Sequence, residues 1–209
     1  MITAKPTWQG RFFWNSFVRI SMSRSFQEIR IEREPMGGQE GSVLLIGNHI
    51  SWWDGFFALW LNQQVFRKHY YVMMLEEELS KRRFMRQGGA FSINPGNRSI
   101  VESLSYTSSL LKNPKNLVVI FPQGKIHSQY ETEIDFQPGI GKILDRVEGK
   151  SQVVFYAAHM DYLNYSKPIL HFRLGTYTHQ KGNASKEIER AYRDHFARSL
   201  AAQREAYKV

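Results

Sequence analysis

Gly47-Asn48-His49-Ile50-Ser51-Trp52-Trp53-Asp54 is the most informative segment of this chain. It follows the apolar run Val43-Leu44-Leu45-Ile46. His49 and Asp54 are five residues apart, a spacing that separates two side chains around an α-helix and puts them on opposite faces of a strand. They meet only if the chain changes direction between them. We therefore predict a strand over the apolar run, a turn at the glycine and asparagine, and a helix that opens near the serine. Such a bend would place a general base beside the carboxylate that orients it.

A structural interpretation of the same residues is also open. Ser51-x-x-Asp54 resembles a capping box, in which Asp54 would accept a backbone N–H at the start of the helix. Spacing alone does not choose between this role and catalysis, so other segments have to decide.

Outward from this stretch, predicted strands and helices alternate. Strands are predicted at residues 26–31, 43–46, 70–75, 91–93, 117–121, 153–158 and 169–174. Helices are predicted at residues 53–61, 76–86, 98–112, 140–147 and 185–207. This alternation indicates an α/β fold, with one domain over residues 26–209 whose sheet is covered by helices.

The composition narrows the possible functions. The 209 residues are 42% hydrophobic and include no cysteine, which excludes disulfides, thiolate catalysis and cysteine-bound zinc. The seven histidines lack metal-ligand spacing, so no metal is expected. The net charge of +9 favours anionic partners. We expect neither a membrane-spanning helix nor a signal peptide, because no apolar run is long enough and no cleavage site is present.

Residues 1–25 form an N-terminal segment in which aromatic and basic side chains interleave. Lys5, Arg11, Arg19 and Arg24 are its charged residues, and it contains no acid. Such a mixture is typical of a segment that lies in the interface of an anionic membrane. A helix that packs its aromatic side chains on the domain is equally compatible, and both can hold at different positions.

Polar side chains follow three of the predicted strands. His49 and Asp54 follow the strand at 43–46, Asn94 and Arg98 follow the strand at 91–93, and the tripeptide Gln123-Gly124-Lys125 follows the strand at 117–121. In open α/β sheets, sites form where loops leave the carboxyl ends of strands, so we expect these side chains to gather at one edge. Trp52 and Trp53 flank the histidine. One of them is expected to wall a substrate pocket and at least one to be buried in the core.

The order of these motifs resembles that of the glycerolipid acyltransferases, a family that includes lysophosphatidate and glycerol-phosphate acyltransferases. Asn48, His49 and Asp54 match the family's first block, Asn-His-x4-Asp. Residues 91–95 stand at the second block, residues 121–126 resemble the third, Phe-Pro-Glu-Gly-Thr-Arg, and residues 153–158 resemble the valine-rich fourth. The resemblance covers roughly residues 40–160. It implies a single domain with a mixed central β-sheet, as in glycerol-phosphate acyltransferases.

Two arginines that hold the acceptor's phosphate in the family fall on Pro95 and Ile126 here. Arg98 and Lys125 are the candidates to replace them, and Gln123 stands where the family has glutamate. These departures put a glycerol-phosphate acceptor in question. They make a lipid with less phosphate, such as a glycosylated or amino-acid-bearing lipid, an alternative acceptor.

The resemblance implies transfer of a fatty acyl group from acyl-CoA or acyl-carrier protein, as co-substrate, to a hydroxyl or amine of a lipid acceptor. His49 would be the general base and Asp54 would orient it. Asn94, Arg98, Gln123, Gly124 and Lys125 are the candidate substrate-binding residues. Arg98, Lys125 or a backbone N–H near Gly124 could bind an oxyanion or a phosphate. The structural alternative is ordinary loop charge for Arg98 and Lys125, and a tight turn for Gly124. No bound cofactor is expected.

Three other classes of function remain as alternatives. The basic charge is compatible with a nucleic-acid binder, but no recognised module is present, so we expect no nucleic-acid partner. A lipid-binding protein on the same fold and a thioester hydrolase are the closer alternatives. The expected partners are an anionic membrane surface, a lipid acceptor and an acyl-carrier protein. The expected location is cytoplasmic, peripheral on the inner face of the membrane.

Overall fold

Seven strands form one mixed β-sheet in the computed structural model, which describes residues 1–34, 40–95, 99–145, 151–179 and 185–207. In spatial order the sheet runs β1-β7-β6-β2-β5-β3-β4, and every neighbouring pair is parallel except the antiparallel pair β6 and β7. The strands are β1 (Glu28–Arg33), β2 (Ser42–Gly47), β3 (His69–Leu75), β4 (Ala90–Ile93), β5 (Asn116–Ile120), β6 (Ser151–Asp161) and β7 (Ile169–Tyr177). All seven predicted strands are present, and the α/β fold is confirmed.

The central strands explain why their sequences are continuous apolar runs. Every side chain of β2 and β5 is buried, because helices cover both faces of this part of the sheet. The parallel direction of β2, β5, β6, β3 and β4 brings their carboxyl ends to one edge of the sheet, here called the carboxyl edge.

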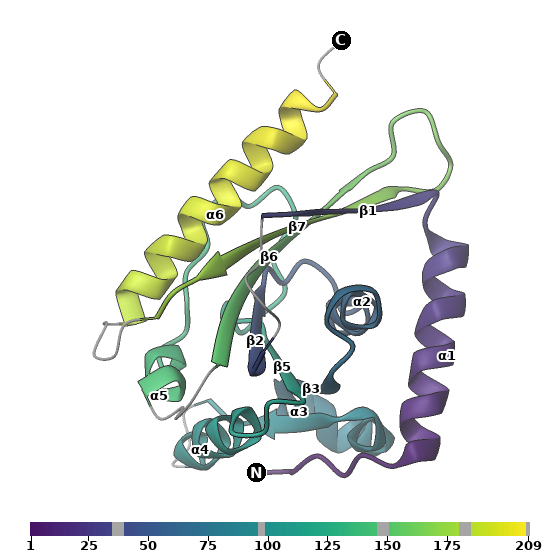
Figure 1. The fold of residues 1–209 in the computed structure, drawn as a ribbon. Helices are drawn as coiled ribbons and strands as arrows, with labels where there is room; N and C mark the ends of the chain where they lie inside the picture. The colour runs from purple at the N-terminus through teal and green to yellow at the C-terminus, as the bar shows by residue number, and fades with distance from the viewer. Residues whose placement is uncertain (35–39, 96–98, 146–150, 180–184, 208–209) are drawn as a thin grey trace.

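Helices lie on both faces of the sheet (Figure 1). They are α1 (Trp8–Ser25), α2 (Asp54–Leu61), α3 (Glu76–Lys81), α4 (Ile100–Leu111), α5 (Ile140–Asp145) and α6 (Ser185–Glu205), with a π-helix η1 (Asn62–Phe66) and a 3-10 helix η2 (Arg83–Gly88). The first core joins α1 and α2 to the sheet, whereas the second joins α4, α5 and α6 to the opposite face. Residues 146–147 and Arg98, which we predicted to be helical, lie outside the described residues.

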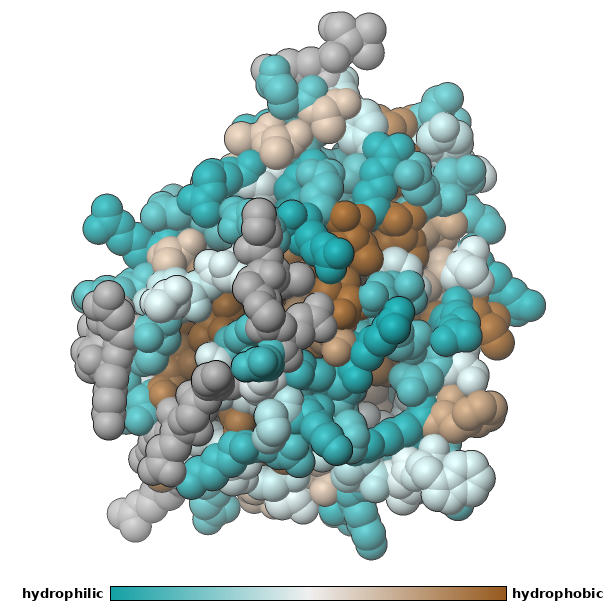
Figure 2. Space-filling model, viewed as in Figure 1, coloured by the Kyte–Doolittle hydropathy of each residue, from teal (hydrophilic) through white to brown (hydrophobic). Residues whose placement is uncertain are grey.

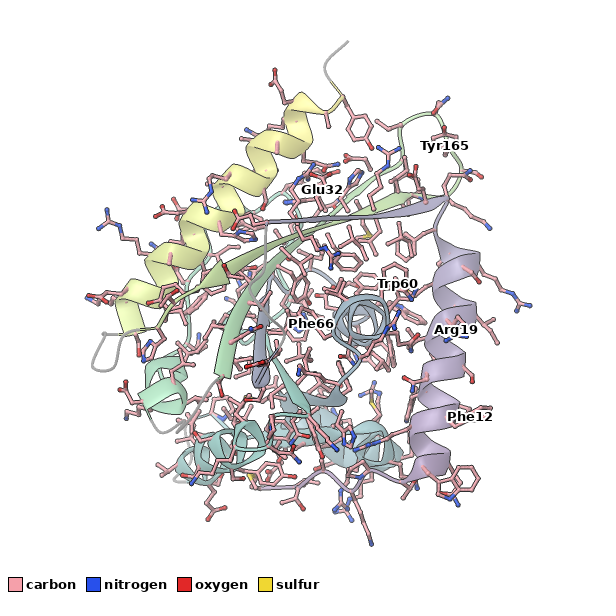
Figure 3. The ribbon with its side chains drawn as sticks, in the orientation of Figure 1. Phe12, Arg19, Glu32, Trp60, Phe66 and Tyr165 are labelled. Carbon is pink, nitrogen blue, oxygen red and sulfur yellow. The ribbon has the colours of Figure 1, made fainter. Side chains whose placement is uncertain are left out.

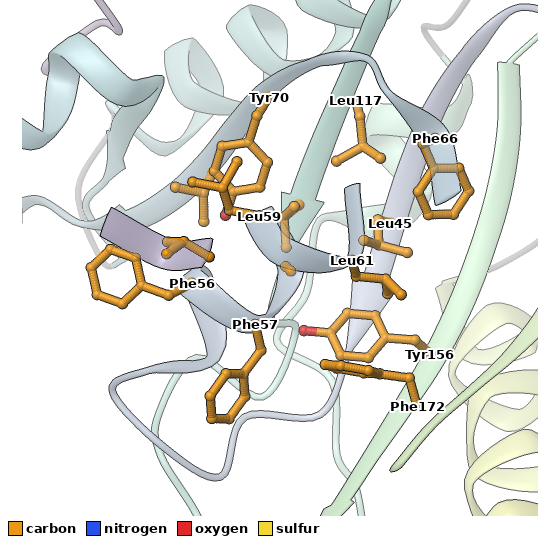
Figure 4. Close-up of a cluster of buried hydrophobic side chains, with 14 of the residues drawn as sticks. Leu45, Phe56, Phe57, Leu59, Leu61, Phe66, Tyr70, Leu117, Tyr156 and Phe172 are labelled. Atoms are coloured by element: carbon orange, nitrogen blue, oxygen red, sulfur yellow. The ribbon is translucent and has the colours of Figure 1, made fainter. Parts of the chain in front are cut away.

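The core between α2 and the sheet is packed with large apolar side chains (Figure 4). Phe57 and Leu61 of α2, Leu45 of β2 and Phe172 of β7 all belong to it. Burial of each such side chain contributes roughly 1.5–3 kcal/mol to folding before the entropy cost. This packing holds the first turn of α2, and with it Asp54, at a fixed height above the sheet.

α1 packs one of its stripes on the domain, whereas the membrane contact that its sequence also suggested stays a prediction. Thr7 caps its start by accepting the backbone N–H of Gly10. Trp14, Val18 and Met22, spaced four residues apart, are buried in the first core. Trp8 and Phe12 are 76% and 70% exposed on the outward side. α1 is thus attached to the domain by one stripe while another aromatic stripe faces solvent. No helix in the described part of the chain is long and apolar enough to span a bilayer.

A buried polar layer separates the carboxyl-terminal half of α6 from the sheet. Arg173 of β7 donates from Nε and Nη2 to the two carboxylate oxygens of Glu32, at 3.0 Å each, and it also contacts Gln203 of α6. His171 Nε2 lies 2.8 Å from the hydroxyl of Tyr207. His159 of β6 is 7% exposed, and its Nε2 has no hydrogen-bond partner among the described residues.

This layer predicts acid sensitivity of the fold. Burial, reinforced by the positive charge of Arg173, lowers the pKa of His159 from 6.5 to about 4, against the opposing effect of Asp161; His171 and His195 face the same layer. The unfolded state therefore binds more protons in this interval, so stability is complete above pH 6.5 and is lost as the pH falls toward 4, by about 3 kcal/mol from His159 alone.

Denaturant melts of wild type and His159→Leu at a series of pH values measure this contribution. The variant should show a shallower loss of unfolding free energy between pH 6.5 and 4. At pH 8, where the histidine is neutral in both states, the difference between the two proteins reports packing alone. Equal pH slopes in both proteins would exclude His159 as the source of the sensitivity.

Candidate active site

The chain turns between β2 and α2 as the spacing of His49 and Asp54 predicted. His49 follows the carboxyl end of β2, and Asp54 is the first residue of α2. His49 Nδ1 lies 2.7 Å from Asp54 Oδ2. If Asp54 is ionised it accepts the Nδ1 hydrogen, which leaves the lone pair of the imidazole on Nε2. The pair therefore has the geometry of a base with its orienting carboxylate.

Asp54 also holds the loop that carries the histidine. The same Oδ2 atom accepts the backbone N–H groups of Ile50 at 2.7 Å and Ser51 at 2.8 Å. The carboxylate therefore stabilises the turn in the manner of a cap while it contacts the ring. The capping role and the catalytic geometry, which the sequence left as alternatives, are compatible in one side chain.

The loop after β5 and the strand β6 fix the backbone around His49. Its N–H donates to Gln123 Oε1 at 2.6 Å, and its carbonyl accepts the N–H of His127 at 2.9 Å. Both partners lie in the connection that follows β5. On the other side, the Asn48 side chain exchanges two hydrogen bonds with the backbone of Ala158 in β6, at 2.9 and 2.8 Å. The carboxyl ends of three strands thereby clamp the histidine.

Gly47 is required at the last residue of β2 because an aromatic ring occupies the space beside it. A Cβ atom at this position would lie 2.2 Å from the ring of Tyr156, which is itself fully buried. Any side chain here would push the ring or the strand aside. The glycine thus lets β2 and β6 bring their polar ends close together.

A cavity of about 440 Å³ opens beside the histidine, a volume within the range of small-molecule pockets. His49 and Lys125 lie at its wall together with side chains that are almost all apolar. The apolar lining comes from α1, the turn before α2, α2, β3, η2, β4 and the loop after β5: Trp14, Trp52, Phe56, Leu59, Tyr70, Val72, Met73, Met74, Leu75, Met85, Ala90, Ile93, Phe121 and Ile126. The pocket can take an extended apolar group with one end at the imidazole.

The carboxylate of the His49–Asp54 pair is buried away from water. Asp54 is 1% exposed, and this burial raises the pKa of its carboxyl group. The hydrogen bonds from His49 and from the N–H groups of Ser51 and Ile50 lower the same pKa and oppose the effect of burial. Asp54 Oδ1 is buried and has no hydrogen-bond partner among the described residues. A positive charge on the ring of His49 would offset the buried negative charge of Asp54.

Only some of the other predicted site residues lie at the pocket. Gly124, with φ of +71°, and Lys125 line the pocket, but the N–H of Gly124 donates to the carbonyl of Phe121 at 3.1 Å and is used by the turn. Gln123 is 4% exposed and bonds to the backbone of His49, which gives it a positioning role. Asn94 is half-buried beyond the end of β4 and is not among the lining residues. Arg98 lies outside the described residues.

Several residues of the site were not predicted from the sequence. Phe121 stacks on the ring of His49 with centroids 4.7 Å apart, and Trp14 of α1 forms part of the pocket wall. Trp52 lines the pocket, as one tryptophan was expected to do. The expectation that at least one of the pair is buried in the core was wrong, because Trp52 and Trp53 are 42% and 41% exposed. Both residues lie in the turn just before α2, where Phe17 of α1 stacks on Trp53 and leaves both rings partly exposed.

Among the described residues, no group of three or more His, Cys, Asp or Glu side chains could hold a metal ion.

Comparisons with known proteins agree with this architecture. The model of the family described as Acyltransferase matches residues 19–160, more than half of the chain and including His49 and Asp54. The crystal structure of the 1-acyl-sn-glycerophosphate (LPA) acyltransferase PlsC from Thermotoga maritima is similar, with a TM-score of 0.60 and 14% sequence identity. That alignment covers 91% of this chain and 78% of the other, and at this identity it shows a shared fold. No curated protein sequence matches the chain significantly. The chain therefore belongs to the acyltransferase family and is an enzyme that transfers acyl groups.

Proposed function

We propose that this protein transfers a fatty acyl group from a thioester donor, acyl-CoA or acyl-carrier protein, to a hydroxyl or amine of a lipid acceptor. The observation that carries the proposal is the His49–Asp54 pair at the wall of a 440 Å³ apolar pocket. A base and an extended apolar cavity are the two parts that such a transfer needs. The family and the fold support the acyl-transfer class; the donor and the roles of the two residues are our inference.

The reaction follows from the position of the imidazole. Nε2 of His49 takes the proton of the acceptor hydroxyl as its oxygen attacks the thioester carbonyl carbon. Asp54 stabilises the imidazolium that results. When the tetrahedral intermediate collapses, the carbon–sulfur bond breaks and the imidazolium returns the proton to the thiolate. The products are the acylated lipid and the free thiol, and the enzyme ends in its starting protonation state.

We assign the apolar pocket to the acyl chain. Methionine, leucine and aromatic side chains make up most of its wall, and His49, Glu78 and Lys125 are its titratable side chains besides Tyr70. Lys125 is exposed at the mouth, beside His49. There a cation can contact a phosphate of the donor or acceptor, or the oxyanion of the intermediate.

The sequence and the site restrict the identity of the acceptor less than that of the donor. Pro95 and Ile126 occupy the positions of the arginines that hold a phosphate in the glycerolipid acyltransferases. Lys125 supplies a point charge without the paired donors of a guanidinium. We therefore propose a lipid acceptor that depends less on a phosphate monoester, with a glycosylated or amino-acid-bearing lipid as the leading candidate.

We also propose that the enzyme is peripheral to the cytoplasmic face of a membrane. The support is the outward stripe of α1, where exposed aromatic side chains stand beside Arg19 and Arg24 and no acid occurs in residues 1–25. Deletion of this segment would not test the idea cleanly, because Trp14, Val18 and Met22 belong to the core.

The decisive experiment is incubation of the protein with labelled acyl-CoA, or labelled acyl-carrier protein, and a total lipid extract. We expect label in one lipid class, which mass spectrometry identifies. Release of free thiol without an acylated lipid would indicate a hydrolase. Binding of lipid without turnover of either donor would indicate a lipid-binding protein.

The pocket assignment predicts a change in chain-length preference for Ala90→Leu. Ala90 is 2% exposed in β4 and lines the pocket, so a larger side chain displaces the end of a long acyl chain. Each methylene that no longer fits costs about 0.8 kcal/mol, or roughly fourfold in kcat/KM. Donors of graded length measure the effect, and short donors should be used as well as by wild type.

Ala201→Leu, at an exposed position of α6, is the matched control and should leave the length profile unchanged. A loss in Ala90→Leu that is the same for short and long donors would contradict the assignment, since a general defect does not depend on chain length.

A further inference from the structure

The exposed apolar side chains of this protein are distributed unevenly. Every large hydrophobic side chain that is exposed in the described part of the chain lies either on α1 or in a segment at or after the carboxyl end of a strand from β2 to β6. On α1 they are Trp8, Phe12, Phe13 and Ile20; after β2, Trp52 and Trp53; at and after β3, Leu75 and Phe84; after β4, Val101; after β5, Ile126 and Tyr130; after β6, Tyr162, Leu163 and Tyr165. Scattered exposed hydrophobic residues are ordinary, but a set concentrated on one helix and one edge of the sheet marks an interaction surface.

α1 packs on α2 in the first core and approaches this carboxyl edge at two places, although its Arg11 reaches His69 at the start of β3, on the opposite edge. Near its start, Trp14 stacks on Phe84 of η2, which follows β3. Past its end, the N–H of Gln27 donates to the carbonyl of Pro168, at the base of the hairpin between β6 and β7, at 2.9 Å. Figure 3 shows Phe12 and Arg19 of α1 and Tyr165 of this hairpin along one margin of the molecule. In Figure 2 a few separate hydrophobic residues stand among hydrophilic ones along the same margin.

The tip of the β6–β7 hairpin has an unusual conformation for its sequence. Tyr162 to Tyr165 form a turn closed by a 2.9 Å hydrogen bond from the N–H of Tyr165 to the carbonyl of Tyr162. Leu163 in this turn has φ of +46°, a left-handed value that glycine adopts freely and leucine adopts at a cost. Its side chain is nevertheless 51% exposed, with Tyr162 and Tyr165 exposed beside it. A leucine in this conformation is costly in a turn where glycine would serve, and half of it is left in solvent; an external contact would account for both features.

We propose that the Tyr162–Tyr165 hairpin tip is a second membrane anchor, which inserts Leu163 into an anionic bilayer that α1 contacts at the same time. The proposal rests on the membrane contact of α1 proposed above and extends it to the whole carboxyl edge. Tyrosine favours the region of the lipid headgroups, and leucine favours the hydrocarbon just below it. Arg19 and Arg24 of α1 supply positive charge for anionic headgroups.

Two contacts on either side of the site would fix the tilt of the enzyme. His49 and the pocket mouth, with Trp52 and Ile126 exposed at its rim, lie at the edge that carries both contacts. An acyl chain or a lipid acceptor could then pass between bilayer and pocket without crossing water. The hairpin would thus orient the site without touching substrate.

Labelling at two positions tests the contact directly, because the chain contains no cysteine. Leu163→Cys and Lys115→Cys each give a single site for an environment-sensitive fluorophore. Lys115 is exposed at the start of β5, on the opposite edge of the sheet. With vesicles of phosphatidylglycerol and phosphatidylcholine, the label at 163 should shift to the blue and the label at 115 should not. Equal behaviour of the two labels would overturn the proposal.

Leu163→Gly separates anchoring from folding, since it should have opposite effects on the two. Glycine relieves the left-handed strain, so the melting temperature should rise, while partitioning onto the same vesicles should fall about tenfold. Asn164→Gly, in the same turn, removes no apolar side chain and should bind as wild type does. Wild-type partitioning of Leu163→Gly would exclude the anchor.

Two further readouts keep this proposal distinct from the proposed function. Turnover of a water-soluble short-chain donor and acceptor by Leu163→Gly should equal that of wild type; if wild type itself shows no turnover, the proposed function fails while the vesicle result stands. A blue shift at 163 that grows with protein concentration in the absence of vesicles would indicate contact with a second copy of the chain, and would overturn the membrane assignment.

Discussion

Replacing His49 with glutamine should lower kcat for acyl transfer by roughly 10²–10⁴-fold, the contribution expected of a positioned general base. Glutamine can still hydrogen-bond to Asp54 Oδ2, but its amide cannot take a proton from the acceptor. The backbone bonds that hold this position, to Gln123 and His127, do not involve the imidazole and should persist. The variant should therefore remain folded, as thermal melts and circular dichroism can establish.

His127→Gln is the matched control for this experiment. The residue lies on the same edge and donates its backbone N–H to the carbonyl of His49, a bond that the exchange preserves. Its turnover should stay close to that of wild type. If instead His49→Gln keeps nearly full turnover, the imidazole of His49 is not the base and the proposed mechanism is wrong.

The strand, turn and helix around His49 were predictable because local rules determine them. An apolar run that is buried on both faces reads as a central strand, and a spacing that fits neither regular element demands a turn. The observed β2, the turn and α2 agree with that prediction. The resemblance of residues 40–160 to a known family predicted the mixed sheet, and the family model and the structural comparison confirm it.

The wall of the pocket could not be predicted in the same way. Apolar residues stand on both sides of α1: Trp14 is buried and lines the pocket, whereas Phe12 is 70% exposed. Periodicity does not separate the inward stripe from the outward one when both are aromatic. Which of them faces the pocket depends on the contacts of α1 with α2 and η2, which are distant in sequence.

The role of Gln123 could not be predicted from the sequence, for a different reason. From the sequence, a polar residue after β5 was assigned to substrate. In the fold its side-chain oxygen accepts the N–H of His49, a partner 74 residues away. Nothing in the sequence around Gln123 indicates that bond. Contact between Gln123 and a substrate stays a prediction, but the hydrogen bond explains why an acceptor oxygen is needed at this position whether the residue is glutamine or glutamate.

Replacing Asp54 with asparagine should also lower kcat by roughly 10²–10⁴-fold, because the imidazolium loses the charge that stabilises it and the ring loses its fixed tautomer. The loop should survive the exchange. Asparagine can turn its carbonyl oxygen to the place of Oδ2 and still accept the N–H groups of Ile50 and Ser51. Its amide nitrogen then takes the place of Oδ1, which has no partner among the described residues. Kinetics with saturating donor, together with thermal melts, measure the two effects separately.

The sign of the stability change makes this variant informative. Burial raises the pKa of Asp54, so the folded state disfavours the ionised form, and removal of the charge at neutral pH favours folding. The N–H donors of the new amide at the buried place of Oδ1 oppose this gain, so the melting temperature should change little. Asp54→Ala should behave differently: it leaves the N–H groups of Ile50 and Ser51 without an acceptor, at about 1–3 kcal/mol for each group that stays buried. Activity lost in both variants, with stability lost only in the alanine variant, would separate the charge from the scaffold. An asparagine variant with nearly full turnover would instead assign Asp54 to the loop alone, because the geometry of the turn would then be all that catalysis requires of it.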